Sequence, residues 1–129
     1  MLKKWNNGPQ TVLITVLNSS MINFPYPPSL NHLFAGQQRR YKSKKYKAWI
    51  AEADIAILQQ RPHKIKGKVK FSVLLGKPDK RRRDLDNVGA KAILDRLVAH
   101  GIIEDDSLVE SIFMAWADVE GAVVEILPC

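Results

Sequence analysis

The apolar residues of this chain repeat with two different periods, and the order of these periods restricts the folds that the chain can form. Over residues 44–60 they recur at i, i+3, i+4, i+7 and i+11, which predicts a helix with a single apolar stripe. Over residues 69–75 the period is two, which is typical of a half-buried strand. The helix stripe consists of Tyr46, Trp49, Ile50, Ala53 and Ile57, and the inward strand positions are Val69, Phe71, Val73 and Leu75.

The remaining elements follow from the residues that interrupt these periods. Residues 21–24 form a short strand that ends at a run of prolines, because proline cannot donate to a β-ladder. A second helix is expected over residues 88–99, and Gly101, just after it, stops it. The other expected segments are an extra edge strand at 11–17, an irregular basic loop over 29–42, a charged loop over 76–83, and two final strands at 107–117 and 122–127. The order β-α-β-α-β-β predicts an α+β fold with two layers, a single domain over residues 1–129 in which a small mixed β-sheet packs against two helices.

Charge is distributed unevenly along the chain. Residues 1–83 contain 18 Lys/Arg and 3 Asp/Glu, residues 84–129 contain 2 Lys/Arg and 10 Asp/Glu, and the whole chain carries a net charge of +7. An excess of this size favours a polyanionic partner such as nucleic acid, although a basic solvated surface would have the same composition. The separation of signs favours a metal-dependent nuclease, because cations hold phosphate while carboxylates hold a metal ion.

Several other classes of protein are disfavoured. The one cysteine, Cys129, cannot form an intrachain disulfide, which predicts a reducing, cytoplasmic location. The three histidines show no zinc-ligand spacing, and no serine or cysteine has the neighbouring base that nucleophilic catalysis needs. No apolar run approaches the about 20 residues of a membrane span, so no membrane association is expected. The first 17 residues also lack the cleavage site of a signal peptide.

The sharpest local feature is the run Lys77-Pro78-Asp79-Lys80-Arg81-Arg82-Arg83-Asp84-Leu85-Asp86-Asn87, in which four consecutive cations precede two carboxylates. If the backbone is extended there, Asp84 and Asp86 point to the same side and can share one cation, and Mg²⁺ prefers such oxygen ligands. The alternative is structural: Asp86 or Asn87 caps the second helix, and Asp84 is a solvated turn residue. Capping does not require the run of arginines, and a helix N-terminus favours nearby negative charge in either case.

A second acidic group, Glu104-Asp105-Asp106, follows the second helix. Taken alone, this triplet would be an exposed acidic turn. Because one short helix separates it from Asp86, we expect the two loops that flank the helix to lie near each other.

Two basic segments, residues 39–47 and 61–70, interleave cations with aromatic or apolar residues. Such segments are compatible with contacts to the DNA backbone and with base stacking. The alternative is a solvated loop, with Tyr46 in the core. Phosphate contacts of this kind would give affinity without sequence preference and would weaken as salt rises.

In this order and spacing, these residues make the chain resemble the RusA family of Holliday junction resolvases (crossover junction endodeoxyribonucleases). The resemblance extends from about residue 21 to residue 127. Its most specific part is Pro78 through Asn87, followed by Lys91-Ala92-Ile93-Leu94-Asp95-Arg96-Leu97 and then by Gly101 and Asp105-Asp106. Pro25-Tyr26-Pro27-Pro28-Ser29, with Asn31 soon after, matches the N-terminal signature of the family.

The resemblance implies a Mg²⁺-dependent endodeoxyribonuclease in which Mn²⁺ can substitute, acting in recombination and repair, with a phage or prophage as an expected source. It implies a homodimer that binds branched DNA and cuts opposed strands of a four-way junction. Carried over by position, Asp84, Asp86 and Asp106 would be the catalytic metal-binding carboxylates, and Lys91 would contact the scissile phosphate. The residues expected to bind DNA are Asn31, Arg39, Arg40, Lys42, Lys44, Lys45, Lys80, Arg81, Arg82 and Arg83.

The chain departs from the family pattern in two places. The family spaces its lysine as Asp-x-Asp-Asn-x-x-Lys, whereas three residues separate Asn87 from Lys91 here. An extra residue inside the helix would rotate Lys91 by about 100° relative to the aspartates, so we expect Gly89 to absorb the insertion. Residues 1–20 exceed the usual N-terminus and form an atypical extension, with Met21 as the expected biological start.

Two other functions and one structural question stay open. The chain could be a non-catalytic branched-DNA-binding protein of the same fold, in which the displaced lysine has abolished cleavage. It could also be a metal-dependent enzyme acting on nucleotides, which leaves the basic N-terminal half unexplained. The strand at 107–117 is apolar on both faces, with Ile112 on one and Phe113 on the other, and could be buried either at a subunit contact or within the domain.

Overall fold

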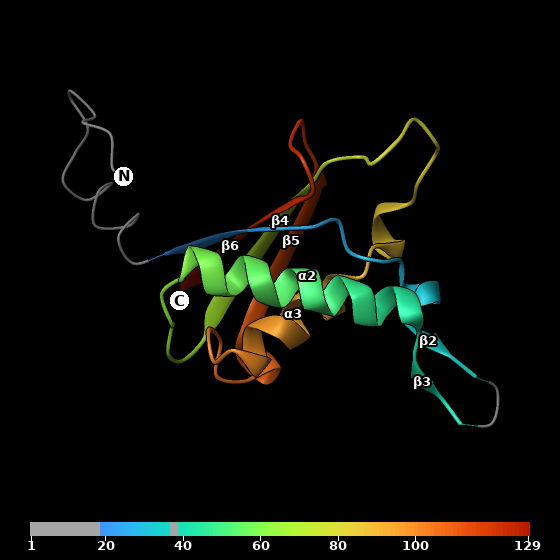
Figure 1. Cartoon of the computed structure of the whole chain (residues 1–129). Helices are drawn as coiled ribbons and strands as arrows, with labels where there is room; N and C mark the ends of the chain where they lie inside the picture. The colour runs from blue at the N-terminus through green and yellow to red at the C-terminus, as the bar shows by residue number, and fades with distance from the viewer. Residues whose placement is uncertain (1–18, 37–38) are drawn as a thin grey trace.

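The computed structural model describes residues 19–36 and 39–129 (Figure 1). The main elements follow the predicted order β-α-β-α-β-β. They are β1 (Ser20–Phe24), α2 (Lys44–Gln60), β4 (Val69–Leu75), α3 (Ala90–Ala99), β5 (Val109–Trp116) and β6 (Ala122–Pro128). Shorter 3-10 turns precede or connect them: η1 (Leu30–His32), η2 (Leu85–Asn87) and η3 (Asp106–Leu108). The strand expected at 11–17 lies outside the described residues.

The segment predicted as an irregular basic loop, residues 29–42, has more structure than expected. It contains η1 and an antiparallel ribbon of two short strands, β2 (Phe34–Ala35) and β3 (Tyr41–Lys42). The ribbon satisfies backbone hydrogen bonds that an irregular loop would leave to solvent. The ribbon leads through Ser43 directly into α2, so its basic residues lie beside the first turn of that helix.

Two element boundaries were also wrong. The helix expected from residue 88 begins at Ala90, because Ser29 pairs with Val88 in an isolated β-bridge and the Gly89 N–H donates to the carbonyl of Pro28 (3.1 Å). The strand expected from residue 107 begins at Val109, because the carboxylate of Asp105 accepts from the Ser107 N–H (3.0 Å) and starts η3.

The main sheet has the strand order β1-β6-β4-β5 and is mixed, as predicted. Strand β6 lies antiparallel to both β1 and β4, whereas β4 and β5 are parallel. Parallel neighbours need a crossover connection, and the segment that contains α3 supplies it. Because β5 is the last strand in this order, it is an edge of the sheet.

Both helices cover the same face of the sheet and form the second of two layers (Figure 1). Every main element except β5 contributes buried residues at alternate or stripe positions to one core, and β5 contributes only partly buried side chains. The buried residues include Ile22 and Phe24 of β1, Phe71 and Val73 of β4, Val124 and Ile126 of β6, Tyr46, Trp49, Ala53 and Ile57 of α2, and Ala92, Ile93 and Leu97 of α3. The stripe predicted from the sequence is therefore the buried face of α2, apart from Ile50, which packs at its margin.

The N-terminus of α2 is capped by a serine. The Ser43 side chain accepts from the Tyr46 N–H (3.1 Å), which satisfies one of the free donors of the first turn. The Ser43 hydroxyl also bonds to the carbonyl oxygen of His32 (2.5 Å) and ties the helix to η1. Among the residues that the structure describes, no helix has both the length and the apolar character that crossing a membrane requires.

Candidate functional site

A surface cavity of about 690 Å³ lies where four segments of the chain meet. These segments are the proline segment (residues 25–29) with η1, the first half of α2, the arginine loop (residues 76–83), and the stretch from Asp84 into η2. Its polar lining residues are Tyr26, Ser29, His32, Lys45, Glu52, Arg81, Arg82, Arg83, Asp84 and Asn87. The cavity thus places four cations beside an aspartate that the sequence singled out.

The proline segment is held in place from two sides. The indole Nε1 of Trp49 donates to the carbonyl of Pro25 (3.0 Å), and the Gly89 N–H donates to the carbonyl of Pro28 (3.1 Å). A Cβ atom on Gly89 would lie 2.3 Å from the Pro28 carbonyl oxygen, so only glycine permits this approach. The close approach brings the start of α3, and with it Asp84 and Asn87, to the wall of the cavity.

Asp79 organises the arginine loop. Its carboxylate accepts from Nη2 of Arg83 (2.7 Å), and from the backbone N–H (3.0 Å) and Nε (3.1 Å) of Arg81. The Arg83 hydrogen bond, followed by the backbone bond from Arg81, lowers the pKa of Asp79 to about 2. The guanidinium of Arg83 also lies 6.0 Å from the ring of Tyr26, a cation–π contact with the proline segment.

Asp84 has no ion pair or side-chain hydrogen bond within the described part of the chain, although three arginines precede it directly. Asp79 forms ion pairs with two of those arginines, Arg81 and Arg83. Asp84 remains exposed at the cavity wall. Asp86 is exposed as well but does not line the cavity.

The extended backbone that would point Asp84 and Asp86 to one side is absent. Asp84 itself is extended (φ −91°, ψ 128°), but residues 85–87 form the 3-10 turn η2. The capping interpretation is also wrong, because the N-cap of α3 is Gly89 and neither Asp86 nor Asn87 occupies it. The two carboxylates therefore do not alternate along one extended strand, and only Asp84 lines the cavity.

The second acidic group forms an exposed turn with local hydrogen bonds. Asp105 accepts from the backbone N–H and the hydroxyl of Ser107, and these bonds lower the pKa of Asp105. Glu104 accepts from the Gly67 N–H (2.7 Å). Asp106 is exposed at the start of η3. In the described residues no three His, Cys, Asp or Glu side chains lie close enough together to hold a metal ion, so the expected gathering of Asp84, Asp86 and Asp106 is not observed.

Lys91 lies on the exposed side of α3 and pairs with Asp95 one turn later (Nζ to Oδ1, 3.5 Å). It is not among the residues that line the cavity. The helix begins at Ala90, so Val88 and Gly89 lie before it. An extra residue at Val88 or Gly89 therefore lies outside the helix and does not rotate Lys91 about the helix axis.

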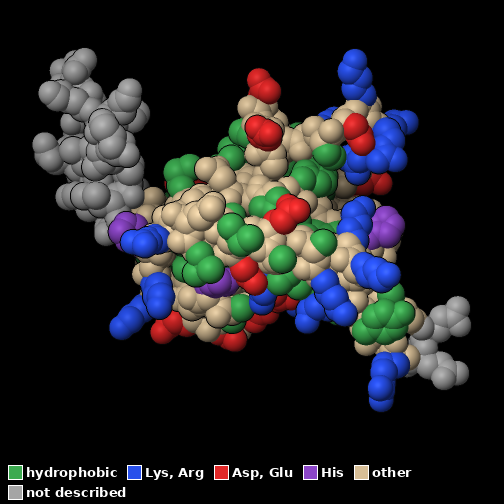
Figure 2. Space-filling view, viewed as in Figure 1, with side chains coloured by type: hydrophobic (Ala, Val, Ile, Leu, Met, Phe, Trp, Pro, Cys, Tyr) green, Lys and Arg blue, Asp and Glu red, His purple; other side chains and the backbone are tan. Residues whose placement is uncertain are grey.

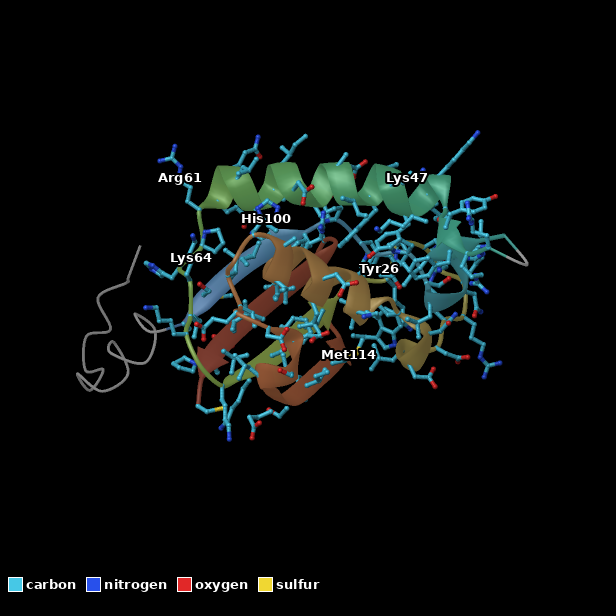
Figure 3. All side chains as sticks on the ribbon, turned by 90° about the horizontal axis from the view of Figure 1, so that it is seen from below. Tyr26, Lys47, Arg61, Lys64, His100 and Met114 are labelled. Atoms are coloured by element: carbon cyan, nitrogen blue, oxygen red, sulfur yellow. The ribbon has the colours of Figure 1, made fainter. Side chains whose placement is uncertain are left out.

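Lys and Arg side chains gather most densely at one end of the molecule (Figure 2), and four of the residues expected to bind DNA line the cavity. Lys45, Arg81, Arg82 and Arg83 line the cavity. Asn31, Arg39, Arg40, Lys42, Lys44 and Lys80 are exposed on η1, on or beside the β2–β3 ribbon, on the first turn of α2 or in the arginine loop. The basic segment at 61–70 is separate: Arg61 and Lys64 lie at the far end of α2 from Lys47 (Figure 3).

Sequence reasoning missed three contributions to the cavity. From the sequence, His32 had at most a phosphate contact and Ser29 only a place in the family signature, and nothing showed that their side chains bond to each other at the cavity wall (Oγ to Nδ1, 2.7 Å). Asp79 was counted only as part of the charged run, and its pairing with Arg81 and Arg83 has no periodic signal. Glu52 lies on the exposed side of α2, and only the tertiary structure shows that this side faces the arginine loop. The cavity therefore combines hydrogen-bonding groups, guanidinium groups and carboxylates from segments far apart in the sequence.

Comparison with known proteins places most of the chain in one family. Residues 25–127 match the family model described as "Endodeoxyribonuclease RusA". A protein of Enterobacteria phage HK97, described as "Crossover junction endodeoxyribonuclease rusA", is 34% identical over 102 residues. That match covers 74% of this chain and 81% of the phage protein.

Proposed function

The chain belongs to the RusA family of endodeoxyribonucleases, and from this premise we propose that it resolves four-way (Holliday) DNA junctions by paired, symmetric, metal-dependent nicks. The crossover-junction activity in the name of the phage HK97 relative supports this choice of substrate. A role in recombination and repair in a reducing cytoplasm is part of the proposal.

The observation that carries the proposal is the state of Asp84. A carboxylate next to three arginines would ordinarily be neutralised by one of them. Here Asp79 takes Arg81 and Arg83, and Asp84 stays free at the wall of the same cavity as those guanidinium groups. A free carboxylate beside clustered cations is the combination that binds a metal ion and a phosphodiester together.

Mg²⁺, or Mn²⁺ in its place, fits the chemistry of the donors. Asp84 and Asp86 offer exposed carboxylate oxygens with no partner in the described residues, and Mg²⁺ in proteins commonly uses one or two carboxylates and keeps several waters. We propose Asp84, Asp86 and Asp106 as its ligands, with Asp106 joining when DNA is bound. A bound Mg²⁺ would polarise the phosphate and make a water molecule more acidic.

The cations of the cavity would act on the substrate. Arg81, Arg82 and Lys45 line it and can neutralise the nonbridging phosphate oxygens, where charge accumulates as the phosphodiester is attacked. Lys91 is proposed as a further contact to the scissile phosphate, which requires its ammonium to leave Asp95. The remaining basic end of the molecule would follow the backbone of a junction arm.

We propose that the protein acts as a homodimer through β5. Two cuts in opposed strands require two sites, and symmetric dimers are the commonest oligomers. Strand β5 is a sheet edge, and Ile112 and Phe113, on its opposite faces, are 54% and 58% exposed. The domain therefore does not bury these side chains itself, and an exposed apolar edge strand favours pairing with a second copy.

A non-catalytic branched-DNA-binding protein is the second candidate. Two observations favour it: the three carboxylates do not form one metal-binding group, and Lys91 pairs with Asp95. Asp84→Asn separates the two functions. It abolishes cutting and preserves junction binding in a nuclease, whereas it changes little in a binding protein.

The decisive experiment is cleavage of a labelled synthetic four-way junction beside a linear duplex of the same sequence. Each is incubated with Mg²⁺, with Mn²⁺ and with EDTA. Paired nicks on the junction alone, lost in EDTA, are the expected result. Tight junction binding without cleavage in either metal would support the second candidate.

A further inference from the structure

The side chains of Ser29 and His32 form a hydrogen-bonded pair at the wall of the cavity. Ser29 Oγ lies 2.7 Å from Nδ1 of His32, and both residues line the cavity together with Lys45, Arg81 and Arg82. Nδ1 is therefore occupied, and Nε2 is the ring nitrogen left for a ligand. Within the described residues, no protein atom bonds to Nε2.

The backbone fixes this pair on both sides. Ser29 pairs with Val88 in a β-bridge, and the His32 N–H donates to the carbonyl of Ser29 (2.9 Å). The carbonyl of His32 accepts from the Ser43 hydroxyl (2.5 Å), and the next residue, Leu33, is buried in the core. The position of the imidazole is thus set before any ligand arrives, as expected of a binding group.

The other histidines have different surroundings. Nε2 of His100 lies 2.8 Å from a carboxylate oxygen of Asp54, so that ring is engaged in packing α3 against α2. His63 is exposed and lies outside the cavity, and within the described ranges its one bond is made by its backbone carbonyl, which accepts from the Ser20 hydroxyl (2.6 Å). His32 alone of the three lines the basic cavity, and its partner is a neutral hydroxyl rather than a carboxylate.

We propose that His32 is a phosphate-contacting residue of this cavity. The Ser29 hydroxyl donates to Nδ1, which leaves the ring hydrogen on Nε2, and Nε2 donates it to a nonbridging oxygen of the DNA backbone. The inference rests on the proposed function, because branched DNA is the ligand. It adds a contact that is specific in geometry and, unlike the contacts of the lysines and arginines, does not depend on a fixed positive charge.

This difference in charge provides the test. Loss of a lysine or arginine contact lowers affinity and also reduces the dependence of binding on salt by about one unit of slope, because fewer counterions are released. Loss of a neutral hydrogen bond lowers affinity and leaves that slope unchanged. Binding of the full chain to a labelled four-way junction is measured in EDTA at pH 8.5, over a range of salt concentrations.

We expect His32→Ala to weaken junction binding about tenfold, as for one hydrogen bond to a charged group, with the wild-type salt slope. His32→Gln, whose amide can donate from a similar position, should recover part of the affinity. Arg82→Ala should lower both affinity and slope. The matched control is His63→Ala, which removes a histidine outside the cavity and should bind as wild type.

Spectroscopy of the wild-type protein keeps the proposal testable if a variant does not fold. The ¹⁵N signals of the His32 ring should report a hydrogen on Nε2 and should shift when the junction is added, whereas those of His63 should not. Ser29→Ala should change the ratio of the two ring tautomers.

The inference fails if His32→Ala binds within twofold of wild type, or if its ring signals do not respond to DNA. Such a result would leave the proposed function intact wherever the wild type still cuts the junction. Wild-type protein that binds the junction without cutting it would remove the proposed activity and leave the His32 contact measurable. Wild-type protein that binds no DNA would overturn both.

Discussion

Nε2 of His100, the C-cap residue of α3, lies 2.8 Å from Oδ1 of Asp54 on α2. Nη1 of Arg96 lies 3.3 Å from both oxygens of the same carboxylate, so one aspartate joins two side chains of the second helix to the first. All three side chains are mostly buried, with 20% to 33% of their surface exposed. These bonds fix the spacing of the two helices that cover the sheet.

Asp54→Ala is therefore expected to destabilise the fold by about 1–3 kcal/mol, because it leaves a largely buried guanidinium and imidazole without their partner. Urea unfolding measures the change. Asp118→Asn, which alters an exposed carboxylate between β5 and β6, is the control and should unfold as wild type. Equal stability of the two variants would show that the helices do not depend on this carboxylate.

Asp79 is expected to link the stability of the arginine loop to pH. Its pKa in the folded protein is about 2, below the ordinary value of about 4, because Arg83 and Arg81 bond to its carboxylate. A lowered folded-state pKa gives stabilisation that is complete above the ordinary pKa and is lost as pH falls through about 2.

Asp79→Asn should consequently unfold at lower denaturant than wild type at pH 5, and the difference should disappear as pH approaches 2. Denaturant titrations at a series of pH values test this. A difference that persists unchanged at pH 2 would mean that the ionised carboxylate is not its source.

Substitutions of Lys91 and of Asp95 are expected to affect the cleavage rate differently. Lys91→Ala should lower the single-turnover rate about 100-fold if the ammonium stabilises charge on the phosphate. Asp95→Asn removes the partner that holds Lys91 at 3.5 Å and should retain at least the wild-type rate. A wild-type rate in Lys91→Ala would exclude this lysine from catalysis, whatever the outcome for the aspartates.

Gly89 is expected to position the cavity. A methyl group there would lie 2.3 Å from the Pro28 carbonyl oxygen, so Gly89→Ala should displace the proline segment, destabilise the fold by about 1–3 kcal/mol and weaken junction binding. Gly67→Ala is the control, because that glycine has a φ of +78° but no atom within 4 Å of its added Cβ. It should cost stability through its backbone and leave junction binding intact. Equal losses of binding in both variants would contradict a local effect at the cavity.

The periods of the sequence predicted the main elements and their order, but not the β2–β3 ribbon or the 3-10 turns. The stripe from Tyr46 to Ile57 and the alternation from Val69 to Leu75 record burial directly, so they predicted α2, β4 and the face that each buries. The strand order was not accessible in this way, because pairing of β6 between β1 and β4 depends on contacts between residues far apart in sequence.

The site could be predicted only where its residues are adjacent in the chain. The arginines and Asp84 form one continuous motif and were found. The bond between Ser29 and His32 depends on the turn η1, and the approach of Pro28 to Gly89 depends on a tertiary contact, so neither leaves a periodic signal. The prediction of an extended backbone from Asp84 to Asp86 was wrong, because residues 85–87 form a 3-10 turn. This turn precedes Gly89, whose N–H donates to the Pro28 carbonyl.

The edge strand β5 leads to the last prediction. Phe113 is 58% exposed on the face of the sheet that the helices do not cover, and no strand among the described residues pairs with the outer edge of β5. If two copies join there, Phe113→Asp places a charge in an apolar contact and should convert a dimer into a monomer in analytical ultracentrifugation.

Leu58→Asp is the matched control, because Leu58 is also an exposed apolar residue (65%) but lies on α2. A dimer that survives Phe113→Asp and dissociates with Leu58→Asp would place the subunit contact on α2. Loss of the dimer with Phe113→Asp alone should also reduce paired cutting of a junction to single nicks, because each protomer would then carry one site to one strand.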